Sequence, residues 1–329
     1  MKTTINEIAR IARVAKSTVS KALNGHKGVS EEKRQYILEL AKKLNYEPSA
    51  TAQALASNRT GSIGLLIPHE AAYSLSGAYW SAMITAIAQT ATRHNYSLLI
   101  LTTPHEGEIS APINTVIRRR NVDGLIIGAE QIDAAATSRL IEEEIPFVFI
   151  GRNSWIHHYA VDVDNLGGSE RLVSHIIEQG YRKIGCLGGP PQYLYTQERV
   201  QGYQRALQKA GITWEAIYYT EYKSEETRRV LGEMLQDHPD MDALCVTAGG
   251  DLLLDCIDVL RFAGIHLKRF GLGAFDDYRF FDYLDIPVCT VRQPIDRLGE
   301  IAASMLFSLL HHRKPPVMQQ VLDVELVLR

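Results

Sequence analysis

The spacing of apolar residues changes near residue 60 of this 329-residue chain. Before that point they recur three or four positions apart, as in Ile5, Ile8 and Ala12, which predicts short amphipathic helices. After it, short apolar runs alternate with longer helical patterns. Such alternation is typical of parallel β-sheets flanked by helices. The chain therefore divides into a small helical head and a larger α/β body.

The head is expected to contain three helices. The first is interrupted by residues 13–15, and in the second Val19, Ala22 and Leu23 face inward. The outward positions of the second helix are Ser17, Thr18, Ser20 and Lys21. Ser30 is placed to cap the third helix, and Pro48 ends the pattern.

Two short helices joined by a tight turn, with small polar side chains on the second, fit a helix-turn-helix. Ser, Thr and Lys side chains at these positions can reach base edges in the major groove of DNA. The alternative is a three-helix structural bundle with a solvated polar face, and amphipathicity alone does not separate the two.

The distribution of charge along the chain favours the helix-turn-helix over the structural bundle. Residues 1–60 carry 11 Lys and Arg against 5 Asp and Glu, a net of +6, so the other 24 and 33 give −9. A cationic module on an anionic body favours a polyanion as partner, because Lys and Arg that neutralise phosphates release condensed counterions. The head is therefore predicted to bind DNA.

Residues 49–57, rich in alanine, follow the head. They are good helix formers, but they fall short of the roughly 12–15 residues that an isolated helix needs in water. We expect this segment to fold when it gains a partner, with Leu55 exposed unless something receives it. An ordinary linker is the alternative.

Several motifs resemble the lactose-repressor (LacI/GalR) family of bacterial transcription regulators, over essentially the whole chain. They are residues 5–9 (INEIA), 17–24 (STVSKALN), 29–30 (VS), 44–50 (LNYEPSA) and 62–65 (SIGL). The resemblance implies that Leu55 lies in a hinge helix and wedges into the minor groove at the centre of a palindromic operator, where an apolar side chain kinks the duplex. Gln53 stands where several members have Arg. The predicted DNA-binding residues are Thr4, Ser17, Thr18, Ser20, Lys21, Asn24, Tyr46 and Leu55.

The body is expected to follow the α/β pattern to its end. Strand-like runs are residues 63–67, 97–101, 124–128, 147–150, 184–187, 244–247, 271–275, 289–291 and a last run, 319–328. The family resemblance implies a two-lobed core similar to periplasmic sugar-binding proteins. The predicted domains are a helix-turn-helix domain (1–48), a hinge and linker (49–60) and an effector-binding and dimerisation domain (61–329). No heptad tail follows the last run, so we expect a homodimer.

Other classes of function find little support. The cysteines, Cys186, Cys245, Cys256 and Cys289, lack the spacing of a zinc site or a disulfide framework and are expected to be buried thiols. No P-loop, GxGxxG, GxSxG or HExxH motif is present, so we expect neither catalysis, metal nor cofactor. No signal peptide or membrane-spanning apolar run is present, which predicts a cytoplasmic protein without membrane contact.

A small-molecule site is implied by the resemblance. Arg199, expected at a helix start, matches an Arg that bonds the effector, and its fixed donors suit a polyhydroxyl ligand. Asp276, after the run 271–275, matches an acceptor for ligand hydroxyls, and Tyr222 matches an aromatic that stacks on the ligand. The alternatives are a surface Arg, a helix-capping Asp and a half-buried Tyr.

The remaining candidates lie on loops after strands, where ligands of such sheets bind. They are Tyr73, Tyr79, Trp80 and Arg152. Gly151 and Gly250 replace an Asp and an Asn that commonly hold ligand hydroxyls in the family, so the ligand chemistry has changed.

The sequence thus predicts a dimeric regulator, most simply a repressor of carbohydrate-use genes, controlled by a sugar or sugar phosphate. The alternatives are a regulator that responds to a purine or another metabolite, a stand-alone binding or transport protein, and, last, an enzyme.

Overall fold

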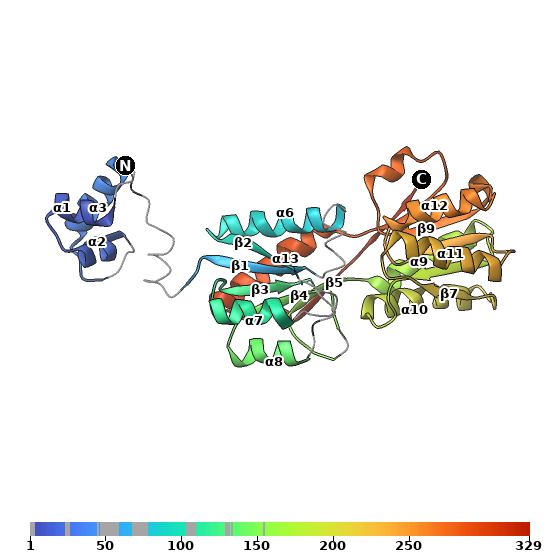
Figure 1. Ribbon diagram of the computed structural model, residues 1–329, viewed down its shortest axis with the longest axis horizontal. Coiled ribbons are helices and arrows are strands. Elements are labelled where there is room, and N and C mark those ends of the chain that lie inside the picture. Colours follow the sequence, from blue (N-terminus) through green and yellow to red (C-terminus); the bar gives the residue numbers. More distant parts are fainter. Residues whose placement is uncertain are drawn as a thin grey trace. The chain divides into compact units, whose positions relative to one another are not determined.

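The computed structural model describes residues 4–23, 27–44, 46, 59–67, 78–102, 110–128, 132, 134–153 and 155–329. It divides into two compact units, residues 1–61 and 62–329. Each unit is described by itself below, and Figure 1 labels the elements. Of the predicted site residues, Asn24, Leu55 and Tyr73 lie outside the described residues, as does the predicted hinge at 49–57.

The head unit contains the three predicted helices, α1 (Ile5–Ala12), α2 (Lys16–Leu23) and α3 (Glu31–Lys43). Side-chain oxygens of Thr4 and Ser30 accept backbone N–H groups at the starts of α1 and α3. Arg13 ends α1 in the left-handed region, at φ 54°, which makes the tight turn into α2. Ile8, Val19 and Ile37, one from each helix, are fully buried against one another and form the centre of the head's small core.

The larger unit contains two six-stranded sheets, and each forms a lobe with its flanking helices. Lobe 1 consists of β1 (Ser62–Ile67), α6 (Ala78–Arg93), β2 (Ser97–Thr102), α7 (Ser110–Arg119), β3 (Gly124–Ile127), α8 (Ala134–Glu142), β4 (Phe147–Ile150), β5 (Ala160–Val163), α13 (Ile295–Leu310) and β11 (Gln319–Leu322). Its strand order is β11-β5-β4-β3-β1-β2, and every pair is parallel. In Figure 1, α6 and α13 cover one face of this sheet, and α7 and α8 cover the other.

Lobe 2 repeats this plan. It consists of α9 (Asn165–Glu178), β6 (Ile184–Gly188), α10 (Leu194–Lys209), β7 (Ala216–Tyr219), α11 (Ser224–Asp237), β8 (Ala243–Val246), α12 (Leu252–Phe262), η1 (Leu267–Arg269), β9 (Gly271–Phe275), η2 (Arg279–Tyr283), β10 (Cys289–Arg292) and β12 (Glu325–Leu328). Its strand order is β12-β10-β9-β8-β6-β7, and only the pair β10–β12 in this sheet is antiparallel.

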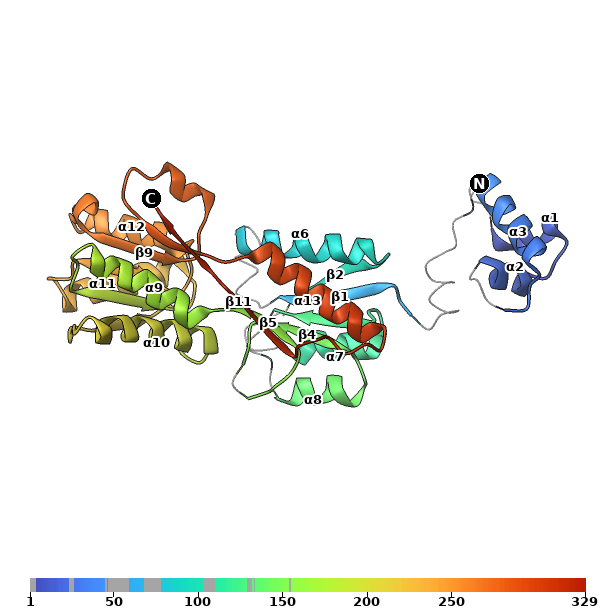
Figure 2. The same ribbon diagram turned by 180° about the vertical axis from the view of Figure 1, so that it is seen from behind.

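The chain passes between the lobes three times, after β5, after β10 and after β11. Figure 2 shows the last passage, in which the chain runs from β11 in lobe 1 to β12 in lobe 2. The prediction of one strand over residues 319–328 was therefore wrong. Residues 323–324 connect two strands that pair with different sheets, because the apolar pattern continues through the crossing.

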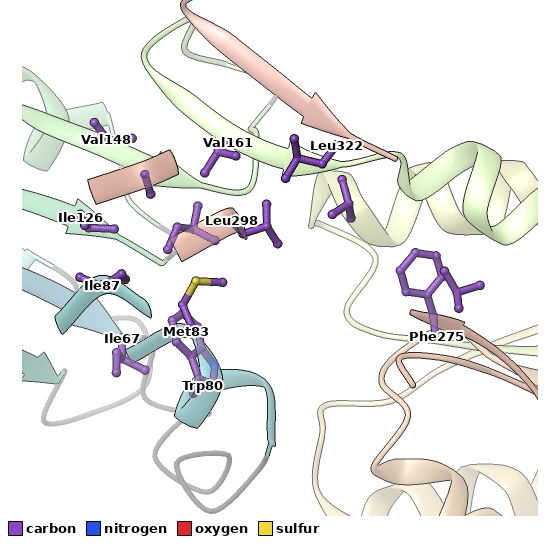
Figure 3. Packing of buried hydrophobic residues seen from close by; sticks show 14 of the residues in the cluster. Ile67, Trp80, Met83, Ile87, Ile126, Val148, Val161, Phe275, Leu298 and Leu322 are labelled. Atoms are coloured by element: carbon purple, nitrogen blue, oxygen red, sulfur yellow. The ribbon is translucent and has the colours of Figure 1, made fainter. Parts of the chain in front are cut away.

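One buried cluster includes residues of both lobes. Figure 3 shows Ile67, Met83, Ile126 and Leu298 packed together in lobe 1, with Phe275 in lobe 2. All of these side chains are essentially fully buried. The strands of both sheets read as continuous apolar runs because helices cover both of their faces.

The cysteines behave as predicted. All four are buried and free, and burial raises the pKa of the Cys186 thiol to about 12, which keeps it protonated and unreactive. In the described part of the chain, no cluster of His, Cys, Asp and Glu could hold a metal ion. None of the helices described is long and apolar enough to cross a bilayer.

Candidate functional site

Arg199 is the most constrained of the predicted site residues. Its guanidinium donates from Nε to Asn165 Oδ1 and from Nη1 to the carbonyl of Thr247, each at 2.9 Å. The guanidinium carbon lies 3.7 Å from the ring centre of Phe275 and 5.0 Å from that of Tyr195. The expectation that Arg199 begins a helix was wrong, because α10 begins at Leu194 and places Arg199 in its second turn. Contacts with Asn165, Thr247 and Phe275, from three other segments, and with Tyr195 of the same helix fix the orientation of this cation.

Asp276 directly follows β9 and is 7% exposed. Its carboxylate accepts hydrogen bonds from Gln293 Nε2 and from the hydroxyl of Tyr278. Burial raises the pKa of Asp276, and the nearby Arg199 guanidinium offsets part of that rise. Burial and the charge of Asp276 likewise raise the pKa of Asp251. Arg199 and Asp276, predicted separately from sequence, therefore form one site with a second carboxyl group close by.

Position 250 has room only for glycine. A Cβ atom built there would lie 2.3 Å from the carbonyl oxygen of Asp276, a distance that real Cβ atoms do not tolerate. The loop after β8 therefore packs directly on the backbone of Asp276. This close backbone contact at position 250 holds Asp276 in place.

Arg152 follows β4 and is bound by two carboxylates. Its Nη2 donates to both carboxylate oxygens of Glu198, at 3.0 and 2.8 Å, and its Nε donates to Asp162 Oδ2 at 2.9 Å. Gly151, just before it, has φ 87°, a backbone conformation that a side chain would strain. Two carboxylates thus neutralise the positive charge that Arg152 would otherwise offer to an anionic ligand.

Tyr222 packs at the end of β6. A Cβ at Gly189 would lie 2.4 Å from the Tyr222 hydroxyl and 3.1 Å from Thr196 Oγ1. Both hydroxyl oxygens are buried, and neither has a hydrogen-bond partner among the residues that the structure describes. Tyr222 also has φ 60°, an uncommon value for a residue other than glycine. The two hydroxyls therefore stand beside Gly189 at the carboxyl end of β6.

Tyr79 and Trp80 lie at the start of α6 and have different surroundings. Trp80 is 8% exposed and packs over Gly128, where a Cβ would lie only 2.1 Å from the indole ring. Tyr79 packs edge-on against it, with ring centres 5.4 Å apart. Burial, Asp276 and Asp251 raise the pKa of Tyr278 in lobe 2, and Tyr79 adds to that rise. Tyr79 is therefore within electrostatic range of Tyr278, whereas Trp80 belongs to the core of lobe 1.

Sequence reasoning missed several residues of this site. They are Asn165, Gln293, Tyr278, Thr196, Asp162 and Glu198. Asn165 and Gln293 lie where the chain passes between the lobes, so their placement depends on the crossings. The available signal was Asp162, a charged residue inside the apolar run of β5, with Asn165 just beyond it, since a buried polar residue needs a partner.

In the head, the outward face of α2 agrees with the predicted polar positions. Ser17 and Lys21 are exposed, Thr18 and Ser20 are partly exposed, and Val19 and Ala22 are buried. Thr4 is exposed at the start of α1, and its hydroxyl also caps that helix. Burial raises the pKa of Tyr46, which packs against the core of the head. The DNA contacts of these residues stay predictions.

Comparison with known proteins assigns both units. Residues 4–49 match the model of the bacterial regulatory proteins of the lacI family. Residues 60–315 match the model of the periplasmic binding proteins and sugar-binding domain of the LacI family. The chain belongs to the LacI family. Its members are DNA-binding regulators rather than enzymes.

Relatives in this family match the whole length of the chain. The HTH-type transcriptional regulator CelR of Thermobifida fusca is 26% identical, over 99% of this chain and 97% of that protein. The structure of a lac repressor dimer bound to operator and an anti-inducer superposes with a TM-score of 0.83 at 22% identity, covering 99% and 98% of the two chains. A CelR–cellobiose complex gives a TM-score of 0.74 at 23% identity, covering 99% and 98%. These similarities show a LacI-type fold with a helix-turn-helix head and a two-lobed core.

Proposed function

We propose that this LacI-family protein is a homodimeric repressor that acts in the cytoplasm, binds a palindromic operator and controls carbohydrate-use genes. The observation that carries the proposal is the buried Arg199, held by Asn165 and the Thr247 carbonyl beside Asp276. This polar site belongs to the same chain as a helix-turn-helix head whose polar face is exposed. Two-fold symmetry of the protein requires a matching symmetry of the operator.

The charges at the site favour an uncharged carbohydrate over a sugar phosphate. Asp276 and Asp251 supply two carboxyl groups, whereas Arg199 supplies one guanidinium. The second cation, Arg152, is neutralised by Asp162 and Glu198. A phosphate would meet one guanidinium and two carboxyl groups that do not attract it, while hydroxyl groups can donate to the carboxyl oxygens and accept from Arg199. The cellobiose of the CelR complex belongs to this uncharged class.

The mechanism follows from linkage between the two ligands. A sugar that binds one arrangement of the lobes more tightly shifts the protein toward that arrangement, by no more than its difference in affinity for the two. Because operator affinity depends on the same equilibrium, effector and operator influence each other reciprocally. In this proposal the effector lowers operator affinity, and the predicted hinge at 49–57 transmits the change.

Two experiments test the proposal. A gel-shift and footprint titration on palindromic sites upstream of neighbouring genes should show protection of two half-sites, with affinity that falls as salt rises. A thermal-shift screen should show stabilisation by neutral mono- or disaccharides and none by sugar phosphates or purines at equal concentration. Absence of any footprint at low salt would contradict the regulator. Stabilisation by sugar phosphates alone would contradict the uncharged effector.

A further inference from the structure

Arg152 is a side chain of lobe 1 that binds the helix carrying Arg199 in lobe 2. It stands directly after β4 and Gly151, and its Nη2 reaches both carboxylate oxygens of Glu198 on α10, at 3.0 and 2.8 Å. The side chains of Arg152 and Glu198 are only 22% and 18% exposed, so solvent screens this pair weakly. This largely buried ion pair, in which one nitrogen donates to both carboxylate oxygens, therefore joins the two lobes.

The same arginine is connected to Arg199 by a second route. Arg152 Nε donates to Asp162 Oδ2 at 2.9 Å, and the other oxygen of Asp162 accepts from Asn165 Nδ2 at 3.1 Å. Asn165 Oδ1 in turn accepts from Arg199 Nε at 2.9 Å. Because Glu198 and Arg199 are neighbours on α10, the route is a closed loop that leaves this helix at one residue and returns at the next.

We propose that Arg152 is an interlobe tie that positions Arg199, through Glu198 on one side and Asp162 with Asn165 on the other. The tie favours the lobe arrangement in which Arg152 and Asp162 of lobe 1 contact Glu198 and Asn165 of lobe 2. Arg152 thus acts on the effector through Arg199 and through the lobe arrangement rather than by touching it. Its effect on effector affinity rests on the proposed function, whereas the tie itself does not.

The geometry distinguishes a tie from a direct ligand contact. Both Nε and Nη2 of Arg152 already bind carboxylates, and their directions are set by the planar guanidinium. Asp162 is 7% exposed, so loss of Arg152 would leave a buried carboxylate without its cation.

The lobe arrangement can be measured in the full-length protein by energy transfer between two dyes. Cysteines introduced at the exposed positions Glu143 in lobe 1 and Gln208 in lobe 2 would carry them, because the native thiols are buried. An excess of unlabelled protein limits each assembly to one labelled chain. The variants are Arg152→Gln, Glu198→Gln and the double substitution. The control is Arg229→Gln, since Arg229 also pairs with two carboxylates but within a single helix.

If the tie exists, both single variants change the mean transfer efficiency and broaden its distribution to a similar extent. The double variant then adds little to either change, and the control matches the parent protein. Such non-additivity is expected of two residues that share one interaction. Unchanged transfer in both single variants, or additive changes in the double variant, would overturn the proposal.

Effector binding supplies a second readout, with cellobiose as the probe in calorimetry. Both single variants should raise its Kd by about 3- to 30-fold, the range typical of residues coupled in one network. A loss with Arg152→Gln but not with Glu198→Gln would make Arg152 a ligand contact and refute the positioning role. If the parent protein binds no neutral sugar, the proposed effector class fails, and the energy-transfer result still decides the tie.

Discussion

The guanidinium of Arg199 lies 3.7 Å from the centre of the Phe275 ring, and Asp276 is the next residue along the chain from that ring. The end of β9 thus supplies both an aromatic face for the cation and the carboxylate that offsets its charge. A cation over an aromatic face is stabilised further when it is desolvated, as Arg199 is at 6% exposure. This pairing underlies the first prediction.

Replacing Arg199 by Lys should abolish most of the effector response. A lysine ammonium cannot keep the fork that reaches Asn165 and Thr247 while it offers further donors to a ligand. We expect effector Kd to rise by about 10- to 100-fold, the size of one lost charged hydrogen bond or more. Calorimetry and effector-induced release of operator measure this change. Arg205→Lys, at an exposed position of the same helix, is the control. Equal effects of the two substitutions would contradict the role of Arg199.

Replacing Gly250 by Ala should destabilise lobe 2. The added Cβ meets the Asp276 carbonyl at 2.3 Å, and backbone cannot yield as a flexible side chain would. We expect a loss of about 1–3 kcal/mol in the free energy of unfolding, as for other overpacked sites. The control is Gly232→Ala within α11, where nothing lies within 4 Å, and it should stabilise the protein by about 0.5–1 kcal/mol. Thermal and urea unfolding would show the opposite signs, and a stable Gly250→Ala variant would contradict the close packing.

Replacing Thr196 by Val should raise stability. Its buried hydroxyl has no partner among the residues that the structure describes, and an isosteric apolar group removes that polar atom. We expect a gain of about 1 kcal/mol in the free energy of unfolding. Thr220→Val is the matched control, because that equally buried hydroxyl bonds Thr227 at 2.9 Å and its loss should be destabilising. A lower melting temperature for Thr196→Val would show that its hydroxyl is satisfied in solution.

Stability should fall in acid partly through Asp277. Burial alone would raise the pKa of this carboxyl, but hydrogen bonds from Arg329, Thr290 and Arg292 outweigh it and lower the pKa. A carboxyl whose pKa is lower in the folded state contributes stability above its unfolded pKa, near 4, and loses it as pH falls through the folded value. Asp277→Asn should therefore cost on the order of 2 kcal/mol at pH 7, since it leaves charged partners unpaired, and much less near pH 2. Urea unfolding across pH 2–7 tests this. A pH-independent loss would contradict the linkage, and Asp296→Asn, at an exposed position, is the control.

Sequence patterns predicted the head well because each of its helices carries its own local signals. Thr4 and Ser30 cap helices as their residue types allow, and Ile8, Val19 and Ile37 recur at helical spacing. The central strands were also recognisable, since sheets covered on both faces require uninterrupted apolar runs. The strands β5 and β7 were not found, because Asp162 interrupts the apolar run of β5 and two tyrosines end that of β7.

The site was only partly predictable. Arg199 and Asp276 were named from the family resemblance and from their positions after strands. The place of Arg199 in the second turn of α10 and the hydrogen-bond partners of both residues did not follow from the sequence. Arg152 was expected to bind the effector, and the structure places it in ion pairs with Asp162 and Glu198. Its effector contact remains untested. These pairs join segments 10 and 46 residues away in the chain, and no local pattern encodes such distances.

The sequence by itself determined that a basic helix-turn-helix head precedes an α/β body, because helix capping, periodicity and charge act over a few residues. The tertiary structure decided what the body does with its polar residues. Three passages between the sheets bring Asn165 and Gln293 beside Arg199 and Asp276, and they split the last apolar run between two lobes. The physical reason is that strand order, set by packing of the whole chain, determines which buried charges meet.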